Sequence, residues 1–291
     1  MNIEKAVIPV AGLGTRFLPA TLSIPKVMIP ILDQPSLHYC VAEAINSGIT
    51  KIIFVISENQ KDIIENYFGC HDAVVDALKS KGDVESLNKI EKISHMVEMD
   101  FVLQKAPLGL GHAVLMAKKM IGENSFAVLL PDDLILGNNP TLKQLCAIHA
   151  DGNELVLAIK KVAPESVSHL GIVATNDQTG EIRDITGVIE KPSLMDAPSD
   201  LAIVGRYILP PQIFQAIENS NQGALGEIQL TDAIAALIPH LGCKGYLFQN
   251  KHFDVGIPIG LLKATIHQAL KRDDTHDDLV HWLKNLSLDK K

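Results

Sequence analysis

Short, almost wholly apolar segments recur through the first half of the chain and limit the folds open to it. They lie at 5–10, 51–57, 100–104, 125–130 and 155–160, and stretches between them have the apolar spacing of helices. A strand without polar alternation is buried on both faces, as in a parallel sheet covered by helices on each side. The alternation therefore predicts an α/β fold with right-handed βαβ crossovers.

From Gly171 onwards the pattern changes. Apolar segments at 171–174, 182–191 and 201–209 follow one another with short turns and little helix between them. We therefore expect a partly antiparallel layer to be added to the sheet. Helical spacing predicts helices at 35–48, 58–68, 112–120, 211–219, 227–238, 259–272 and 277–286, and a helical surface insertion at 70–98.

Composition narrows the classes of protein open to the chain. It has 291 residues, of which 47% are hydrophobic, enough for one large α/β domain. The formal net charge of −8 gives no basic footprint for nucleic acid or for an anionic membrane. We see no signal peptide and no apolar run near the ~20 residues of a spanning helix, so we expect a soluble, cytoplasmic protein.

The cysteines and the C-terminal segment indicate structure rather than chemistry. The four cysteines are widely scattered and form no C-x-x-C, so we expect buried thiols rather than a zinc or redox site. Histidines and aspartates at 276–281 are poorly spaced for a metal. The same segment predicts an amphipathic helix with four apolar residues facing inward, namely Leu279, Trp282, Leu283 and Leu286.

A glycine-rich loop follows the first apolar segment. Gly12 and Gly14 leave backbone N–H groups open to a phosphate or a base edge, and Arg16 and Lys26 bring positive charge into the same loop. The spacing does not match the dinucleotide fingerprint, because Phe17 stands where a third glycine would be needed. The glycine and lysine spacing of a P-loop does not occur either. Our hypothesis is a nucleoside triphosphate site, and the alternative is a tight turn before a proline-rich loop.

Further motifs follow in a definite order over nearly the whole chain. They are Ala6–Arg16, Pro25-Lys26, Pro107–Ala113, Leu130–Asp132, Gly187–Pro192, Ala202–Tyr207 and Gly226–Ile234. Together these motifs resemble the sugar nucleotidyltransferases and, more narrowly, the bacterial UTP–glucose-1-phosphate uridylyltransferases. The resemblance implies a nucleotide-diphospho-sugar transferase fold, that is, a Rossmann-like, doubly wound, mixed but mainly parallel sheet with a small antiparallel sugar-side extension.

The same resemblance implies how the chain is organised. We expect one nucleotidyltransferase domain over 1–291, with a nucleotide half at about 1–150 and a sugar-side half at about 151–270. The C-terminal helices would span 259–286. Family members commonly form dimers or tetramers, so we expect a homo-oligomer, with the C-terminal helix as a plausible contact.

On the nucleotide side, the resemblance assigns the backbone of Ala11 and Gly12 to uracil. It assigns the Gln104 side chain and the Gly109 backbone to the same base, whose carbonyl and N–H edge suits a neutral amide. Gln104 as a polar strand terminus is the plain structural alternative, and we interpret His112 as structural or as a neighbour of the ribose. The residues implied in nucleotide binding are Ala11, Gly12, Gly14, Gln104, Gly109 and Asp132.

The resemblance also implies a Mg²⁺ site and three catalytic cations. Asp132 and Asp254 would hold Mg²⁺, which prefers one or two carboxylates together with phosphates and waters. The alternatives are a cap for Asp132 and a turn for Asp254, and Asp133 is expected to be a helix or turn cap. The implied catalytic residues, which face the phosphates, are Arg16, Lys26 and Lys191.

On the sugar side, Glu190 would accept hydrogen bonds from sugar hydroxyls and Lys191 would hold the sugar phosphate. Gly171 and Gly187 would admit the sugar against the backbone. Outside the motif series, Glu-Lys-Pro is an ordinary surface turn. Thr231 and Asp232 we interpret as packing or capping groups.

The implied activity is transfer of UMP from UTP to α-D-glucose 1-phosphate, giving UDP-glucose and pyrophosphate by Mg²⁺-assisted direct displacement. The family pattern has a lysine, a glutamate and a lysine where this chain has Leu22, Val27 and Pro258, and the neighbouring Ser23 and Ile257 also differ from it. These departures leave open a dTTP or other sugar 1-phosphate enzyme, and a weakly active regulatory homologue. A nicotinamide oxidoreductase is a third alternative, against which the missing third glycine counts.

Overall fold

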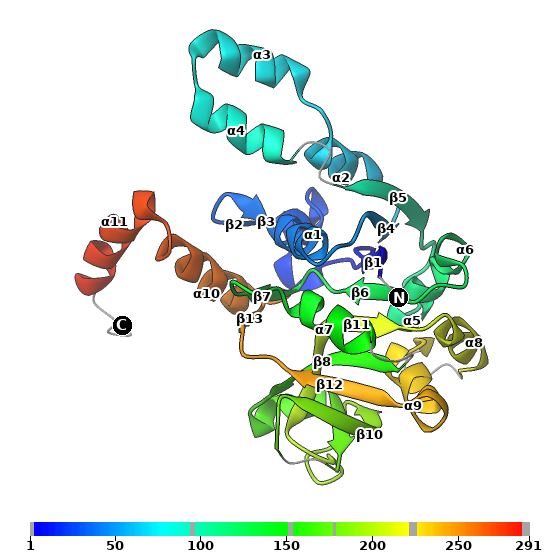
Figure 1. Cartoon of the computed structure of the whole chain (residues 1–291). Coiled ribbons are helices and arrows are strands. Elements are labelled where there is room, and N and C mark those ends of the chain that lie inside the picture. Colours follow the sequence, from blue (N-terminus) through cyan, green and yellow to red (C-terminus); the bar gives the residue numbers. More distant parts are fainter. Residues whose placement is uncertain (1–2, 94–96, 151–153, 177–178, 221–225, 287–291) are drawn as a thin grey trace.

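One nine-stranded sheet runs through the computed structural model, which describes residues 3–93, 97–150, 154–176, 179–220 and 226–286 (Figure 1). The strands lie in the order β5-β4-β1-β6-β11-β8-β12-β10-β9. Their bounds are β1 Lys5–Pro9, β4 Lys51–Ile56, β5 Glu98–Leu103, β6 Phe126–Leu129, β8 Leu155–Lys161, β9 Gly171–Thr175, β10 Ile182–Glu190, β11 Leu201–Leu209 and β12 Cys243–Leu247.

The first four strands of the sheet, β5, β4, β1 and β6, are parallel, as the apolar segments predict. The expectation of an added antiparallel layer is wrong in one respect. Strand β11 lies in the middle of the same sheet, antiparallel to both β6 and β8, and β9 pairs with it at Ala202–Ile172. Strands β8, β12, β10, β9 and β11 thereby pair in a closed circuit that extends the sheet.

Helices cover both faces of the sheet, and residues within one strand alternate between two cores. On β1, Val7 belongs to one apolar cluster while Ala6 and Ile8 belong to the other, as the two-residue period of a strand requires. The helices are α1 Ser36–Asn46, α2 Lys61–Phe68, α3 Asp72–Lys81, α4 Val84–Ile93, α5 Leu110–Met116, α6 Lys118–Ile121, α7 Thr141–Ala150, α8 Gln212–Asn219, α9 Leu230–Leu241, α10 Pro258–Ala269 and α11 Asp273–Lys284.

Two short ribbons and four 3₁₀ turns complete the described chain. The ribbons pair β2 (Pro30–Ile31) with β3 (Gln34–Pro35), and β7 (Asp133–Leu136) with β13 (Lys251–Asp254). Strands β7, β12 and β13 are not predicted from the sequence, because each is only four or five residues long and carries polar residues. The 3₁₀ turns are η1 Thr15–Phe17, η2 Ala20–Leu22, η3 Lys26–Met28 and η4 Pro164–His169.

Two expectations about exposure are wrong. Trp282 and Leu286 are 56% and 40% exposed, because α11 packs against α10 and projects away from the sheet (Figure 1). Cys70 is exposed between α2 and α3, not buried. The helical surface insertion is confirmed as α3 and α4, which project from the body (Figure 1). Among the described residues, no helix has both the length and the apolar character needed to cross a membrane.

Helix α10 begins so close to strand β13 that one glycine is essential to the contact. A Cβ on Gly260 would lie 1.7 Å from the Asp254 carbonyl oxygen, whereas a Cβ on Gly187 would lie 3.9 Å from its nearest neighbour. Gly→Ala in a helix normally stabilises by up to about 1 kcal/mol. At Gly260 we expect the opposite sign, because the helix must move off the strand.

We predict that Gly260→Ala lowers the free energy of unfolding by about 2 kcal/mol or more, measured by urea denaturation. Gly187→Ala is the matched control and should change it by less than about 1 kcal/mol. Equal effects of the two substitutions would show that the close approach at Gly260 is unimportant.

Candidate active site

The parallel strands deliver the predicted nucleotide residues to one edge of the sheet. Strands β1, β5 and β6 are parallel and end at Pro9, Leu103 and Leu129. The glycine loop, Gln104 and the turn that carries Asp132 follow them directly. In open α/β sheets, ligands bind outside the carboxyl ends of strands.

The glycine loop folds against Lys26. A Cβ on Gly12 would lie 3.5 Å from Lys26 Cε. Gly14 has φ +65°, and a Cβ there would lie 2.9 Å from both Lys26 Cβ and Thr21 Cγ2. The Thr21 hydroxyl donates to the Gly14 carbonyl at 2.9 Å. Gly14 is therefore needed for its left-handed backbone and for the close approach of two neighbouring side chains.

Lys26 forms an ion pair with Asp132 at 2.6 Å. The two side chains are 23% and 33% exposed. Burial alone raises the pKa of Asp132, but the charge and hydrogen bond of Lys26 more than offset burial, so the pKa lies below its ordinary value. The Asp132 carboxylate is therefore ionised at neutral pH and already has a cation beside it.

The ribbon of β7 and β13 brings Asp254 to Asp132. Asp254 pairs with Asp133 in the ribbon, and the Val255 N–H donates to the Asp132 carbonyl at 2.8 Å. A Cβ on Gly256 would lie 3.0 Å from Asp254 Oδ1 and 3.2 Å from Asp132 Oδ2, so both carboxylates reach one point. Burial, together with the charges of Asp133 and Asp132, raises the pKa of Asp254.

Two converging carboxylates fit a Mg²⁺ ion that completes its shell with phosphates and waters. Among the described residues, no group of three or more His, Cys, Asp or Glu is arranged to hold a metal. A closed, all-protein cage for a softer metal is therefore absent from that part of the chain. The donor chemistry agrees with the ligand pair expected from the sequence.

Asp133 is not a cap, contrary to the expectation from the sequence. Its Oδ1 lies 2.7 Å from His252 Nε2, which ties β7 to β13. A Cβ on Gly205 would lie 2.5 Å from Asp133 Oδ2, so only glycine fits on β11 behind this carboxylate. Asp133 thus supports the ribbon that carries Asp254.

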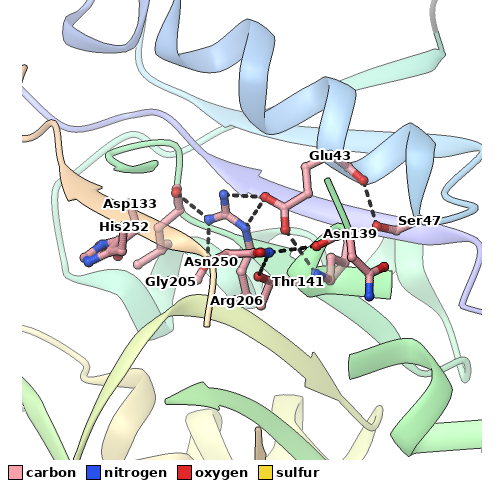
Figure 2. A network of polar contacts seen from close by, with 11 residues as sticks. Glu43, Ser47, Asp133, Asn139, Thr141, Gly205, Arg206, Asn250 and His252 are labelled. Atoms are coloured by element: carbon pink, nitrogen blue, oxygen red, sulfur yellow. Dashed lines mark hydrogen bonds and ion pairs between the residues drawn. The ribbon is translucent and has the colours of Figure 1, made fainter. Parts of the chain in front are cut away.

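Glu43 and Arg206 form a buried ion pair (Figure 2). Arg206 also bonds the carbonyl of Leu130, at the start of the turn that carries Asp132. Nε and Nη2 of Arg206 donate to Glu43 Oε2 at 2.9 and 2.8 Å, and Nη1 donates to the carbonyls of Leu130 and Gly205 at 2.9 and 3.1 Å. Glu43 Oε1 accepts the Leu142 N–H at 3.0 Å. Arg206 stood only within a motif in the sequence analysis, and Glu43, on an apolar helix, gave no signal.

On the base side, two glycines allow the loop after β5 to lie against Ile228. Gly109 has φ +98°, and a Cβ on it would lie 2.7 Å from the Ile228 carbonyl oxygen. Gly111 N–H donates to that oxygen at 2.9 Å, and Ile228 N–H donates to the Leu108 carbonyl at 2.8 Å. This pairing fixes the backbone next to Gln104, a contact that no motif reveals.

On the sugar side, Glu190 is held by two neighbours. The Thr231 hydroxyl donates to Glu190 Oε2 at 2.7 Å, and Lys191 Nζ lies 3.4 Å from Oε1. Thr231 therefore positions Glu190 and is more than a packing group. A Cβ on Gly171 would lie 3.2 Å from Glu190 Oε2, whereas a Cβ on Gly187 would make only an ordinary van der Waals contact, at 3.9 Å from Ala174 Cβ. Lys191 has φ +46° after the end of β10.

Tyr207 links the two halves of the site. Burial, followed by the charges of Asp133, Glu190 and Asp132, raises the pKa of its phenol. The Tyr207 hydroxyl therefore lies within electrostatic reach of both the Asp132 turn and the sugar-side carboxylate. Arg16 is exposed in η1, and its positive charge partly opposes the rise in the pKa of Asp254. The Arg16 side chain therefore lies within electrostatic reach of the Asp254 carboxylate.

A family model described as nucleotidyl transferase matches residues 5–270, and the chain belongs to this family. Its curated relatives include two proteins named UTP–glucose-1-phosphate uridylyltransferase. The one from Staphylococcus saprophyticus is 40% identical over 287 residues, which cover 99% of each chain. The one from Bacillus subtilis is 38% identical over 285 residues, 98% of this chain and 96% of its relative.

Solved structures agree with the sequence comparison. A UTP-bound UGPase from Acinetobacter baumannii is 39% identical with a TM-score of 0.89, covering 98% of this chain and 100% of its own. A UDP-glucose pyrophosphorylase complexed with UDP-glucose is 36% identical with a TM-score of 0.83, covering 93% and 100%. The family and the mixed α/β fold predicted from the motifs are thereby confirmed.

The Glu43–Arg206 pair gives a prediction about stability. The two side chains are 8% and 1% exposed, so removing one partner leaves a buried charge without compensation. We expect Arg206→Met alone to cost about 3–5 kcal/mol of unfolding free energy, and Glu43→Leu a similar amount. The double variant should cost clearly less than the sum of the two, by urea denaturation. Additive costs would contradict direct coupling.

The Lys26–Asp132 pair gives a prediction about pH. A lowered carboxyl pKa stabilises the fold above the unfolded pKa, and this stability is lost as the pH falls through the folded pKa. In Lys26→Met burial, the largest influence, is opposed only by the smaller effects of a backbone hydrogen bond and of Arg206, so the ionised carboxylate stabilises the fold less than in wild type. The stability gap between wild type and Lys26→Met should be largest near neutral pH and shrink below about pH 4.

Urea midpoints measured across this pH range test the prediction. Lys89→Met is the matched control, because Lys89 forms only an exposed pair with Glu85 on α4. A gap for Lys26→Met that does not change with pH would show that Lys26 does not set the ionisation of Asp132.

Proposed function

We propose that this chain transfers UMP from UTP to α-D-glucose 1-phosphate, giving UDP-glucose and pyrophosphate. The observation that carries the proposal is the convergence of Asp132 and Asp254 beside Lys26 at the carboxyl edge of the sheet. Full-length similarity to relatives named for this reaction supports the choice of substrates. The titles of two similar structures name UTP and UDP-glucose.

In the proposed reaction, a phosphate oxygen of glucose 1-phosphate attacks the α-phosphorus of UTP in line. The bond from the α-phosphorus to the bridging oxygen breaks, and pyrophosphate leaves with that oxygen. Negative charge must be held and positioned throughout, and no covalent enzyme intermediate is needed. Arg16 and Lys26 supply fixed positive charge to the triphosphate, and Lys191 holds the sugar phosphate.

The remaining proposed contacts orient the two substrates. The backbone of Ala11, Gly12 and Gly14 lies against the nucleotide, and Gln104 and Gly109 read the base. Glu190, which Thr231 and Lys191 hold in place, accepts hydrogen bonds from sugar hydroxyls. Gly171 and Gly187 leave the backbone open to the sugar ring.

We propose that Asp132 and Asp254 hold Mg²⁺. The ion supplies positive charge that neutralises the phosphate oxygens. Lys26 Nζ lies 2.6 Å from Asp132 Oδ2, so its charge is placed to act on both this carboxylate and the phosphate oxygens of a bound nucleotide. Burial and the charges of Asp133 and Asp132 raise the pKa of Asp254, and a bound cation would favour its ionised form.

We also propose the domain organisation, the cellular role and the oligomeric state of the chain. The chain acts as one domain over 1–291, with a nucleotide half at about 1–150, and serves carbohydrate metabolism and polysaccharide biosynthesis in the cytoplasm. The acidic balance of the sequence supports small-molecule substrates over nucleic acid or membrane. The exposed Trp282 and Leu286 on α11 support a homo-oligomer, dimer or tetramer.

Pyrophosphate release over a panel of substrates tests the function. UTP, dTTP and CTP are each paired with the 1-phosphates of glucose, galactose and N-acetylglucosamine. We expect the highest kcat/KM for UTP with glucose 1-phosphate, loss of activity with a chelator, and recovery with Mg²⁺. A higher value for another pair would change the substrate assignment, and silence with all pairs would favour the regulatory alternative.

Asp132→Asn tests the metal assignment within the same assay. The amide keeps the shape of the side chain but loses its charge, so we expect kcat to fall at least about a hundredfold. Asp76→Asn, on the exposed face of α3, is the matched control and should keep wild-type rates. Near-normal turnover by Asp132→Asn would exclude Asp132 as a metal ligand.

A further inference from the structure

The side-chain amide of Gln104 makes two contacts through one of its ends. Nε2 donates to the Gly109 carbonyl at 3.3 Å and lies 2.9 Å from His112 Nδ1. Gln104 is only 7% exposed, and within the described part of the chain no group bonds to its Oε1. The nearly buried side chain therefore keeps one acceptor, Oε1, to which no described group donates and which is left for a ligand.

The two contacts fix which way the amide points. A backbone carbonyl can only accept a hydrogen bond, so the end of the amide facing Gly109 must be the NH₂ group. That NH₂ group then points its second hydrogen at His112 Nδ1, which can accept only when its ring proton is on Nε2. Burial lowers the pKa of His112, which favours the neutral ring.

We propose that His112 is a specificity-determining residue for the base, because its Nδ1 lone pair holds the Gln104 amide with Oε1 directed at the ligand. Oε1 accepts a hydrogen bond from a base with an N–H at its pairing edge. Uracil carries such an N–H at N3, whereas cytosine presents a lone pair there. His112 acts through Gln104 and does not touch the base, and the proposal rests on uridine nucleotide binding as proposed above.

This role of His112 in orienting the Gln104 amide differs from that of a helix residue that serves packing alone. His112 lies in α5, two residues after Leu110 at its start, so the ring is carried on a regular element that Gly111 locks to Ile228. Without the imidazole acceptor, the 3.3 Å hydrogen bond to the Gly109 carbonyl is the one remaining polar contact, within the described residues, that holds the orientation of the amide. A rotated amide presents NH₂ to the ligand, which suits the N3 lone pair of cytosine and repels the N–H of uracil.

The test is the ratio of kcat/KM for UTP to that for CTP, with glucose 1-phosphate as acceptor. Both nucleotides are measured on one preparation, so a loss of folded protein cancels from the ratio. We expect the ratio to fall about tenfold or more in both His112→Leu and His112→Ala, which remove the acceptor. His112→Asn should restore most of it, since Asn Oδ1 can accept near the position of Nδ1.

Direct competition of UTP and CTP binding, by calorimetry without the sugar phosphate, is the second measurement. His240→Leu is the matched control, an exposed histidine on α9 that should leave both ratios as in wild type. A ratio in His112→Leu within about twofold of wild type would overturn the proposal, as would equal ratios in His112→Asn and His112→Leu.

The failures of the two proposals are distinguishable. If wild type releases pyrophosphate equally with UTP and CTP, the transfer reaction stands and the role of His112 is overturned. If wild type releases none with UTP, the reaction proposed above fails, while the binding ratios still test whether His112 sets the base preference.

Discussion

Arg206 is fully buried, and a buried guanidinium is tolerated only where a counter-charge and acceptors surround it. Glu43 on α1 supplies the charge and accepts two N–H donors, and the carbonyls of Leu130 and Gly205 accept two more. Glu43 in turn accepts the N–H of Leu142 near the start of α7. One ion pair thus joins two helices, β11 and the end of β6 at the point where the chain turns toward Asp132.

The rest of the site depends on that turn. Asp132 projects from it, and β7 leaves it to pair with β13, so Asp254 reaches Asp132 from far along the chain. The contact of Asp133 with His252 and the small size of Gly205 keep the ribbon close to the sheet. Neither Asp133 nor Gly205 needs to touch a substrate, yet the separation of the two carboxylates depends on both.

Sequence alone predicted the parallel strands because burial on both faces leaves an unmistakable run of apolar residues, and their shared edge followed from chirality and parallel pairing. Motif order predicted the family and the site residues. The pairing of Ile228 with Gly111 is a backbone contact without side-chain signal, and Glu43 looks like any polar residue on a helix. The short strand β13 is set by its pairing with β7, which local periodicity does not record. Periodicity did predict the helix α11, but not that Trp282 and Leu286 on it are exposed.

Two of the departures from the family pattern have a physical reason that leaves the charges of the site intact. Val27, where the family pattern described above has a glutamate, is 1% exposed in the core beneath the loop, so an apolar side chain suits this position. Pro258 begins α10, where its missing N–H costs no hydrogen bond. Lys26, next to Val27, is thereby held on a firmly packed 3₁₀ turn and faces Asp132. In an acidic protein, that fixed placement of a single cation does more for an anionic substrate than the overall charge can.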